Sequence, residues 1–193
     1  MSKINIKETI ENLISTFLDA GKVSLELREK GLIKKIKSDN TPVSNGDLEV
    51  NEIIIKKIFQ LTPNIPIVSE ENSENKFKED LKDFWLIDPI DGTNEYINDF
   101  DEFTINAGLI MNKKPVAGLI YAPAKKRMFF SYGENLAFEL INNRPVRLDC
   151  SKAFDKDNIK FVTYSNKIKS EIQKIHKKLN VKKIVKMKSS LKF

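Results

Sequence analysis

The segment FWLIDPIDGTNEY, residues 84–96, constrains the fold of this chain more than any other stretch. Its apolar run ends in two aspartates three residues apart, Asp88 and Asp91, with a proline between them and Gly92-Thr93 behind. Carboxylates placed together at the end of a buried strand lose solvation and repel each other. The sequence therefore predicts a positively charged partner at this strand end.

A second apolar run ends in the same way, because IPIVS at residues 65–69 is followed by Glu70-Glu71. If the two runs are adjacent parallel strands, Glu70 and Asp88 lie side by side at their carboxyl ends, where sites in α/β sheets tend to lie. Oxygen ligands without histidine or cysteine select a hard cation such as Mg²⁺ or Mn²⁺. Pro89 fixes φ in the turn, and a stiff turn could also direct the Ile90 carbonyl at the ion.

The residues after the aspartates suit a phosphate. Gly92 lets the backbone approach a ligand closely, and Gly92-Thr93 would open a short helix whose free N–H groups suit an anion. Carboxylates that share metal ions beside such a turn are the arrangement that two-metal phosphoryl hydrolysis requires. The alternative is that DPIDG is only a turn, since Asp, Pro and Gly are common turn residues. Glu70-Glu71 would then be a solvated charge pair, and the motif alone does not decide between the two.

The rest of the chain predicts a mixed α/β fold, a layered α+β sandwich. Apolar spacing predicts a helix over residues 6–29, closed by Gly31, and a second helix that starts at Ser44 and stops at Pro63. The polar segment between them, 36–47, is predicted to be a loop. Short β-rich runs after the aspartates predict an antiparallel meander, and a strand–helix–strand unit begins near residue 159.

Composition fits a globular protein, with 40% hydrophobic and 31% charged residues among 193. No apolar run has the length of a membrane-spanning helix, and no secretion signal is visible at the N-terminus. The single cysteine, Cys150, excludes an internal disulfide and is interpreted as a plain thiol. We therefore expect a cytoplasmic setting, with peripheral association with the inner membrane as an option.

Charge is unevenly distributed along the chain. Residues 156–193 hold twelve lysines against Asp157 and Glu171, a local balance of +10. Such a tail is compatible with a nucleic-acid-binding module, with a basic lobe that faces an anionic small substrate, or with a general bias of this chain towards Lys, Ile and Asn. We favour the bias, because no aromatic residues of the kind that stack on bases are interleaved. His176, among these lysines, is predicted to be solvated.

Three elements resemble the inositol-monophosphatase superfamily of Mg²⁺-dependent, lithium-sensitive phosphatases. They are TPVSNGD at 41–47, SEEN at 69–72 and WLIDPIDGT at 85–93, in the order and at about the spacing of that family. NEYI at 94–97, EFTIN at 102–106 and GLIYAPA at 118–124 resemble the CysQ-type 3′(2′),5′-bisphosphate nucleotidase branch. The resemblance implies the α-β-α-β-α architecture of inositol monophosphatases and fructose-1,6-bisphosphatases.

The resemblance also implies roles for particular residues. Glu70, Asp88 and the Ile90 carbonyl would hold one Mg²⁺, and Asp88 and Asp91 a second. Ile90, Asp91, Gly92 and Thr93, with Glu70, would bind the scissile phosphate. Asp47 and Thr93 would orient and deprotonate the attacking water, with Glu70 close by. Other roles stay open, since Ser44-x-x-Asp47 is close to a capping box and Thr93 fits as a helix cap. Lys37 is assigned no role.

The resemblance further predicts two parts, a metal- and phosphate-binding lobe at 1–150 and the start of a C-terminal α/β lobe at 151–193. In the family, further strands and a Trp-Asp-x-Ala helix start follow the stretch that SSLKF matches, and that Asp completes the second metal site. The only tryptophan here is Trp85. We therefore expect a truncated chain with an incomplete second lobe, a weakened second metal site and reduced activity.

The predicted function is Mg²⁺-dependent removal of the 3′-phosphate of 3′-phosphoadenosine 5′-phosphate, which yields AMP and phosphate and clears a by-product of sulfate activation. One alternative is the same chemistry on an inositol phosphate. Another is an inactive fragment that needs a separate C-terminal partner or an oligomer. A nucleic-acid-binding module ranks last, so we expect a phosphorylated small molecule as partner, no nucleic acid and no integral membrane segment.

Overall fold

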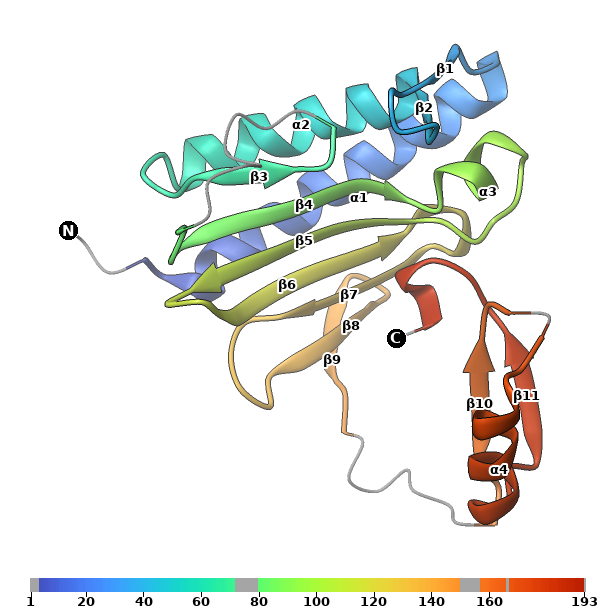
Figure 1. The fold of residues 1–193 in the computed structure, drawn as a ribbon. Helices are drawn as coiled ribbons and strands as arrows, with labels where there is room; N and C mark the ends of the chain where they lie inside the picture. The colour runs from blue at the N-terminus through green and yellow to red at the C-terminus, as the bar shows by residue number, and fades with distance from the viewer. Residues whose placement is uncertain (1–3, 72–79, 150–156, 166, 193) are drawn as a thin grey trace.

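A seven-stranded mixed sheet forms the centre of the computed structural model, which describes residues 4–71, 80–149, 157–165 and 167–192. The strands follow chain order across the sheet, and β3 and β4 are parallel whereas every later pair is antiparallel (Figure 1). The predicted parallel pair and the predicted meander are therefore both present. The strands are β3 (Ile67–Ser69), β4 (Phe84–Asp91), β5 (Thr104–Met111), β6 (Lys114–Ala122), β7 (Arg127–Ser131), β8 (Ala137–Ile141) and β9 (Arg144–Arg147).

Two long helices, α1 (Ile6–Lys30) and α2 (Asn45–Leu61), cover one face of this sheet (Figure 1). Their buried stripes follow the predicted 3.6-residue period. Each fully buried aliphatic or aromatic side chain contributes roughly 1.5–3 kcal/mol, so this helix–sheet layer forms the main core. Its fully buried residues on these helices include Ile10, Leu13, Phe17, Val50, Ile54 and Ile58.

Local signals fix the helix ends as predicted. Gly31, at φ 91°, follows α1 and donates its N–H to the Arg28 carbonyl at 3.2 Å. Ser44 precedes α2 and forms a capping box with Asp47. This box satisfies N–H groups that the first turn of a helix leaves without partners.

The segment predicted to be a loop is in part a small β-hairpin, and that prediction is wrong. β1 (Lys34–Ile36) pairs antiparallel with β2 (Pro42–Ser44), and Ile36 lies opposite Pro42. Proline is tolerated there because it is the first residue of a strand that has a neighbour on one side. β9 was not expected from the sequence either, because its four residues are all exposed and carry no apolar alternation.

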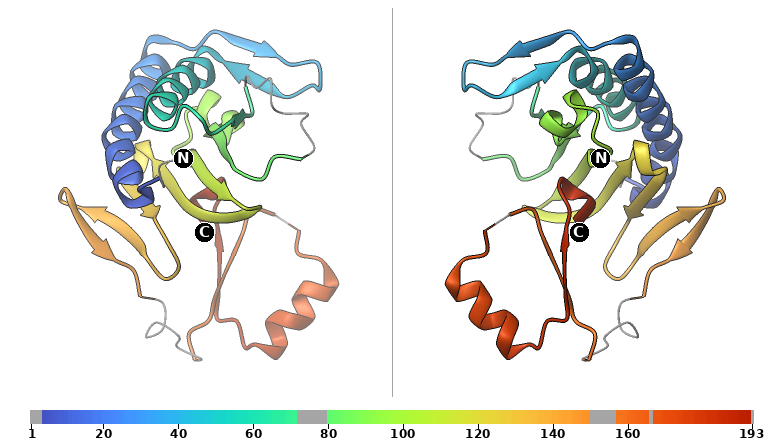
Figure 2. Two further views of the ribbon diagram at one scale, coloured as in Figure 1. Left: turned by 90° about the vertical axis from the view of Figure 1, so that its left-hand side faces the viewer. Right: turned by 90° about the vertical axis from the view of Figure 1, so that its right-hand side faces the viewer.

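The chain ends in a β10–α4–β11 unit of the predicted order. β10 (Lys160–Thr163) and β11 (Lys183–Lys186) are parallel, and α4 (Ser170–Lys178) connects them. Figure 2 shows this unit set apart from the main sheet, after which the one-turn helix η2 (Ser190–Lys192) returns to β5 and β6. A further turn, η1 (Pro123–Lys125), follows β6. The division of the chain into parts at residue 150 remains a prediction.

His176 is not simply solvated, contrary to prediction. Its ring centroid lies 4.1 Å from that of Phe161 on β10, and its Nε2 is buried. Apolar side chains of the same unit, Val162, Tyr164 and Ile184, are exposed. No helix among the described residues is both long enough and apolar enough to cross a membrane.

Candidate active site

The carboxyl ends of β3 and β4 bring two of the predicted acids together. Ser69 lies opposite Ile87 in the parallel pair, and the Glu70 N–H donates to the Ile87 carbonyl at 3.1 Å. Glu70 and Asp88 therefore follow in adjacent positions, and, besides burial, the charge of Glu70 is close enough to raise the pKa of Asp88. The predicted adjacency of the two acids is present in the structure.

The turn after Asp88 requires a glycine. β4 continues to Asp91, and Gly92 then adopts φ 94° before α3 (Thr93–Ile97) begins. This left-handed conformation favours glycine, and a Cβ at residue 92 would lie 3.0 Å from the Glu102 carbonyl oxygen. The Tyr96 hydroxyl donates to the Ser24 carbonyl at 2.6 Å, which fastens α3 to α1. The turn is thus packed closely against Glu102, and the helix that follows it is attached to α1.

Asp47 is fully buried and contacts both the start of α2 and the turn after β4. Its Oδ2 accepts the N–H of Ser44 at 2.8 Å and the Ser44 hydroxyl at 2.6 Å, which caps α2. Its Oδ1 lies 3.1 Å from the Thr93 hydroxyl, which is also 3.0 Å from the Ile90 carbonyl. Burial raises the pKa of Asp47, against the opposing effect of the hydrogen bonds from Ser44 and Thr93. The capping role therefore does not exclude a contact with the turn.

Lys37 contacts Glu70 and Glu71, although the sequence indicated no role for it. Its Nζ lies 2.6 Å from Glu71 Oε1 and 3.3 Å from Glu70 Oε1. The hairpin positions it, since the Lys37 N–H donates to the Thr41 carbonyl at 2.8 Å. Glu71 is not a solvated acid, because its side chain is only 4% exposed. A buried acid needs a nearby cation. The acids at the end of an apolar run are therefore the one feature of the sequence that indicated such a partner.

One ammonium group does not balance this acidic cluster. Burial lowers the pKa of Lys37, but the hydrogen bond and charge of Glu71 and the charge of Glu70 outweigh it, and the net shift is upwards. The pKa of Glu71 is nevertheless raised, because burial and the charges of Asp47 and Glu70 outweigh the attraction of Lys37. A strong Lys37–Glu71 ion pair would raise the pKa of Lys37 and lower that of Glu71, but both are raised. The excess of negative charge around Glu71 accounts for this difference.

The excess of negative charge also affects Asp88. Burial, followed by the charges of Glu70 and Asp91, raises the pKa of Asp88 to about 8. Its Oδ1 is buried and has no hydrogen-bond partner in the described part of the chain. A carboxylate in this setting needs a proton or a cation. The oxygen-only donor set suits Mg²⁺ in its chemistry.

The acids do not yet form one coordination sphere. Over the described ranges, no group of three or more His, Cys, Asp or Glu side chains is arranged to hold a metal ion. Glu70 is engaged by Lys37, and Asp91 Oδ2 accepts both the N–H and the hydroxyl of Ser190. Side-chain rotation would have to bring the carboxylates together, so the ligand sets inferred from the resemblance remain predictions.

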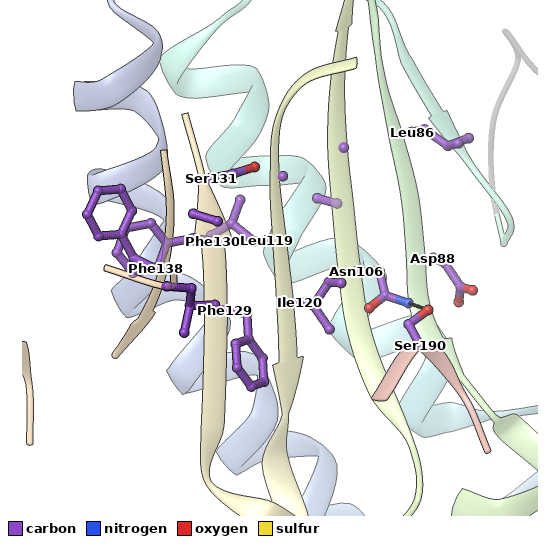
Figure 3. Close-up of a pocket in the computed structure, with 15 residues that line it drawn as sticks. Leu86, Asp88, Asn106, Leu119, Ile120, Phe129, Phe130, Ser131, Phe138 and Ser190 are labelled. Atoms are coloured by element: carbon purple, nitrogen blue, oxygen red, sulfur yellow. Dashed lines mark hydrogen bonds between the residues drawn. The ribbon is translucent and has the colours of Figure 1, made fainter. Parts of the chain in front are cut away.

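A cavity of about 410 Å³ lies beside Asp88, on the sheet face turned away from α1 and α2 (Figure 3). Asp88, Asn106 and Ser190 form its polar end. The remaining walls are mostly apolar and come from β4 to β8, among them Leu86, Leu119, Ile120, Phe129, Phe130 and Phe138. Asn106 and Ser190 could not be identified as site residues from the sequence, because no local pattern links them to Asp91.

Residues 5–192 match the inositol monophosphatase family. The chain belongs to that family. Among its curated relatives is the 3′(2′),5′-bisphosphate nucleotidase CysQ of Buchnera aphidicola, 33% identical over an alignment that covers 100% of this chain and 76% of the relative. CysQ of Haemophilus influenzae is 38% identical over 114 residues, 58% of this chain and 42% of the relative. The matched region thus covers less than half of the length of that relative.

Solved structures of the family share the fold. CysQ from Bacteroides thetaiotaomicron is 25% identical, with a TM-score of 0.69 over 96% of this chain and 74% of that chain. Staphylococcal inositol monophosphatase-1 is 16% identical, with a TM-score of 0.77 over 99% of this chain and 71% of that chain. The second likeness is one of fold alone. The layered α/β architecture predicted from the sequence is therefore confirmed.

Proposed function

We propose that this chain is a Mg²⁺-dependent phosphatase that removes the 3′-phosphate of 3′-phosphoadenosine 5′-phosphate, yielding AMP and phosphate. The observation that carries the proposal is the undercompensated carboxylate cluster at Glu70, Asp88 and Asp91, next to the Asp47–Thr93 pair. The relatives named CysQ bisphosphate nucleotidase support the choice of substrate. A cytoplasmic setting accompanies the proposal as a prediction.

In this proposal Glu70, Asp88 and the Ile90 carbonyl hold one Mg²⁺, and Asp88 and Asp91 hold a second. The buried, unpartnered Asp88 oxygen and the raised pKa of Asp88 support a cation there, because a cation would relieve the repulsion from its neighbours. Mg²⁺ bound at these residues supplies positive charge that stabilises the phosphate oxygens in the transition state and makes water more acidic.

The protein's own residues would then move the protons. A water oxygen forms the new bond to phosphorus while the bond from phosphorus to the ribose 3′-oxygen breaks. That oxygen takes a proton from solvent water, and Asp47 returns the proton that it has gained to solvent after the reaction. Thr93 accepts the proton of the attacking water on its hydroxyl oxygen and passes its own proton to Asp47, 3.1 Å away. The raised pKa of Asp47 makes it a better base than an exposed aspartate.

The test is phosphate release from 3′-phosphoadenosine 5′-phosphate by the purified chain, with Mg²⁺, with EDTA and with lithium. Asp88→Asn should abolish it, whereas Asp80→Asn, the same change at an exposed carboxylate on the surface, should not. Inositol 1-phosphate serves as the competing substrate, and faster turnover of it would move the assignment to an inositol monophosphatase activity. A folded chain without Mg²⁺-dependent turnover contradicts the proposal and favours the inactive chain that needs a C-terminal partner or an oligomer.

A further inference from the structure

We propose that Asn106 and Ser190 are positioning residues that fix the carboxylate of Asp91 for its cation, an inference that rests on the proposed function. The Ser190 hydroxyl lies 2.7 Å from Asp91 Oδ2, and the Ser190 N–H donates to the same oxygen. Asn106 Nδ2 in turn donates to Ser190 Oγ at 3.2 Å (Figure 3). Asn106 and Asp91 are 84 and 99 residues away from Ser190 in sequence. The three side chains thus form one chain of hydrogen bonds that runs from Asn106 through Ser190 to Asp91.

The direction of this line follows from the number of hydrogens. A serine hydroxyl has one hydrogen, and an ionised aspartate only accepts. Because Asn106 donates to Ser190 Oγ, the Ser190 hydrogen is left to point at Asp91. The orientation of the Asn106 amide is consistent, since the reverse orientation would place two acceptors against each other. Hydrogen bonds of this type to a metal-ligating carboxylate fix its orientation.

Both Ser190 donors end on one oxygen of Asp91. Among the described residues, Oδ1 is therefore the oxygen that stays available to a cation, while Oδ2 is held by the protein. Asn106 is itself anchored on β5, where it lies opposite Asp88 in the sheet register. The relay thus ties Asp91 to the strand that also flanks the other proposed ligand.

A plain structural tether is the competing explanation, because the same segment is held at a second point. Lys188 Nζ lies 2.6 Å from Glu95 Oε1, and the Lys188 N–H donates to Glu102 at 3.3 Å. Lys188→Met would weaken this attachment without removing a donor to Asp91. The two explanations therefore differ in which variant changes the affinity for a metal ion.

The experiment measures Mn²⁺ binding by calorimetry and hydrogen exchange of residues 187–192 in the full chain. Ser190→Ala should weaken Mn²⁺ binding about 10-fold, in line with losses on removing a partner of a metal ligand. Ser190→Thr, which keeps a hydroxyl, should retain most of the affinity of the wild type. Asn106→Leu should weaken binding in the same direction, and Lys188→Met should raise exchange without a matching loss of affinity.

Ser131→Ala is the matched control, since it removes a serine hydroxyl from β7 in the wall of the same cavity. Equal Mn²⁺ affinity of the wild type and Ser190→Ala contradicts the positioning role alone. An affinity loss in Lys188→Met as large as in Ser190→Ala contradicts it too and favours the tether. A wild type that binds no Mn²⁺ contradicts the proposed function itself, so the two failures are distinguishable.

Discussion

The hydroxyl oxygen of Thr93 lies 3.1 Å from the carboxylate of Asp47, although 46 residues separate them in sequence. Thr93→Val keeps the shape of the side chain and removes the hydroxyl, so we expect kcat to fall roughly 10²–10⁴-fold, the range for losing general-base assistance. Thr93→Ser should retain most of the activity. Steady-state kinetics with Mg²⁺ measures both, and equal rates of the valine variant and the wild type would remove Thr93 from the mechanism.

Asp47 and Thr93 should act as one unit in catalysis. If they do, Asp47→Asn, Thr93→Val and the double variant will have similar kcat values, because residues that act together are strongly non-additive. Ser44→Ala removes a hydroxyl that both caps α2 and donates to Asp47, and it should lower the free energy of unfolding by about 0.5–2 kcal/mol. Multiplicative losses in the double variant would show instead that the two residues contribute independently.

Much of this fold could be predicted from the sequence because its signals are local. The periodicity of α1 and α2, the caps at Gly31 and Ser44, and the apolar runs of β3 and β4 each lie within a few residues. The hairpin β1–β2 was missed because Pro42 in a polar segment is typical of a loop.

The missed site residues have no local signal. Lys37 meets Glu70 and Glu71 only because the hairpin brings it to the end of β3, 33 and 34 residues away in sequence. Ser190 reaches Asp91 across 99 residues, after the whole β10–α4–β11 unit. Single-sequence patterns identify acids that need partners, whereas the partners depend on tertiary packing.

The metal-free protein should lose stability as pH rises, because of Asp88. Its pKa is about 8 in the folded state and about 3.9 when unfolded. The folded state therefore binds more protons between these values, and the free energy of unfolding falls across that window. Asp88→Asn should flatten the profile and stabilise the metal-free protein at pH 8 by on the order of 1–3 kcal/mol. Urea unfolding in EDTA from pH 4.5 to 8.5 checks this, and parallel profiles for the two proteins would contradict it.

Thr104 should tolerate the removal of its hydroxyl. Its side chain is fully buried, and its Oγ1 has no hydrogen-bond partner within the described residues. An unsatisfied buried hydroxyl costs roughly 1–3 kcal/mol, so Thr104→Val should raise the free energy of unfolding by up to about 1 kcal/mol. It also serves as the matched control for Thr93→Val, since the same substitution should leave kcat unchanged. A stability loss would mean that the hydroxyl has a partner in solution.

Lys37 should compete with the metal ion for Glu70. Lys37→Met removes the ammonium at 3.3 Å from Glu70 and 2.6 Å from Glu71, and leaves the nearly buried Glu71 without its ion pair. We expect the metal-free protein to lose on the order of 1–3 kcal/mol, the cost of an uncompensated buried acid. Mg²⁺ should recover more stability in this variant than in the wild type, because it meets no tethered cation. Thermal unfolding with and without Mg²⁺ measures this, with Lys37→Arg as the control that keeps the charge. A smaller Mg²⁺-induced shift in Lys37→Met than in the wild type would mean that Lys37 assists the ion by holding Glu70 in place.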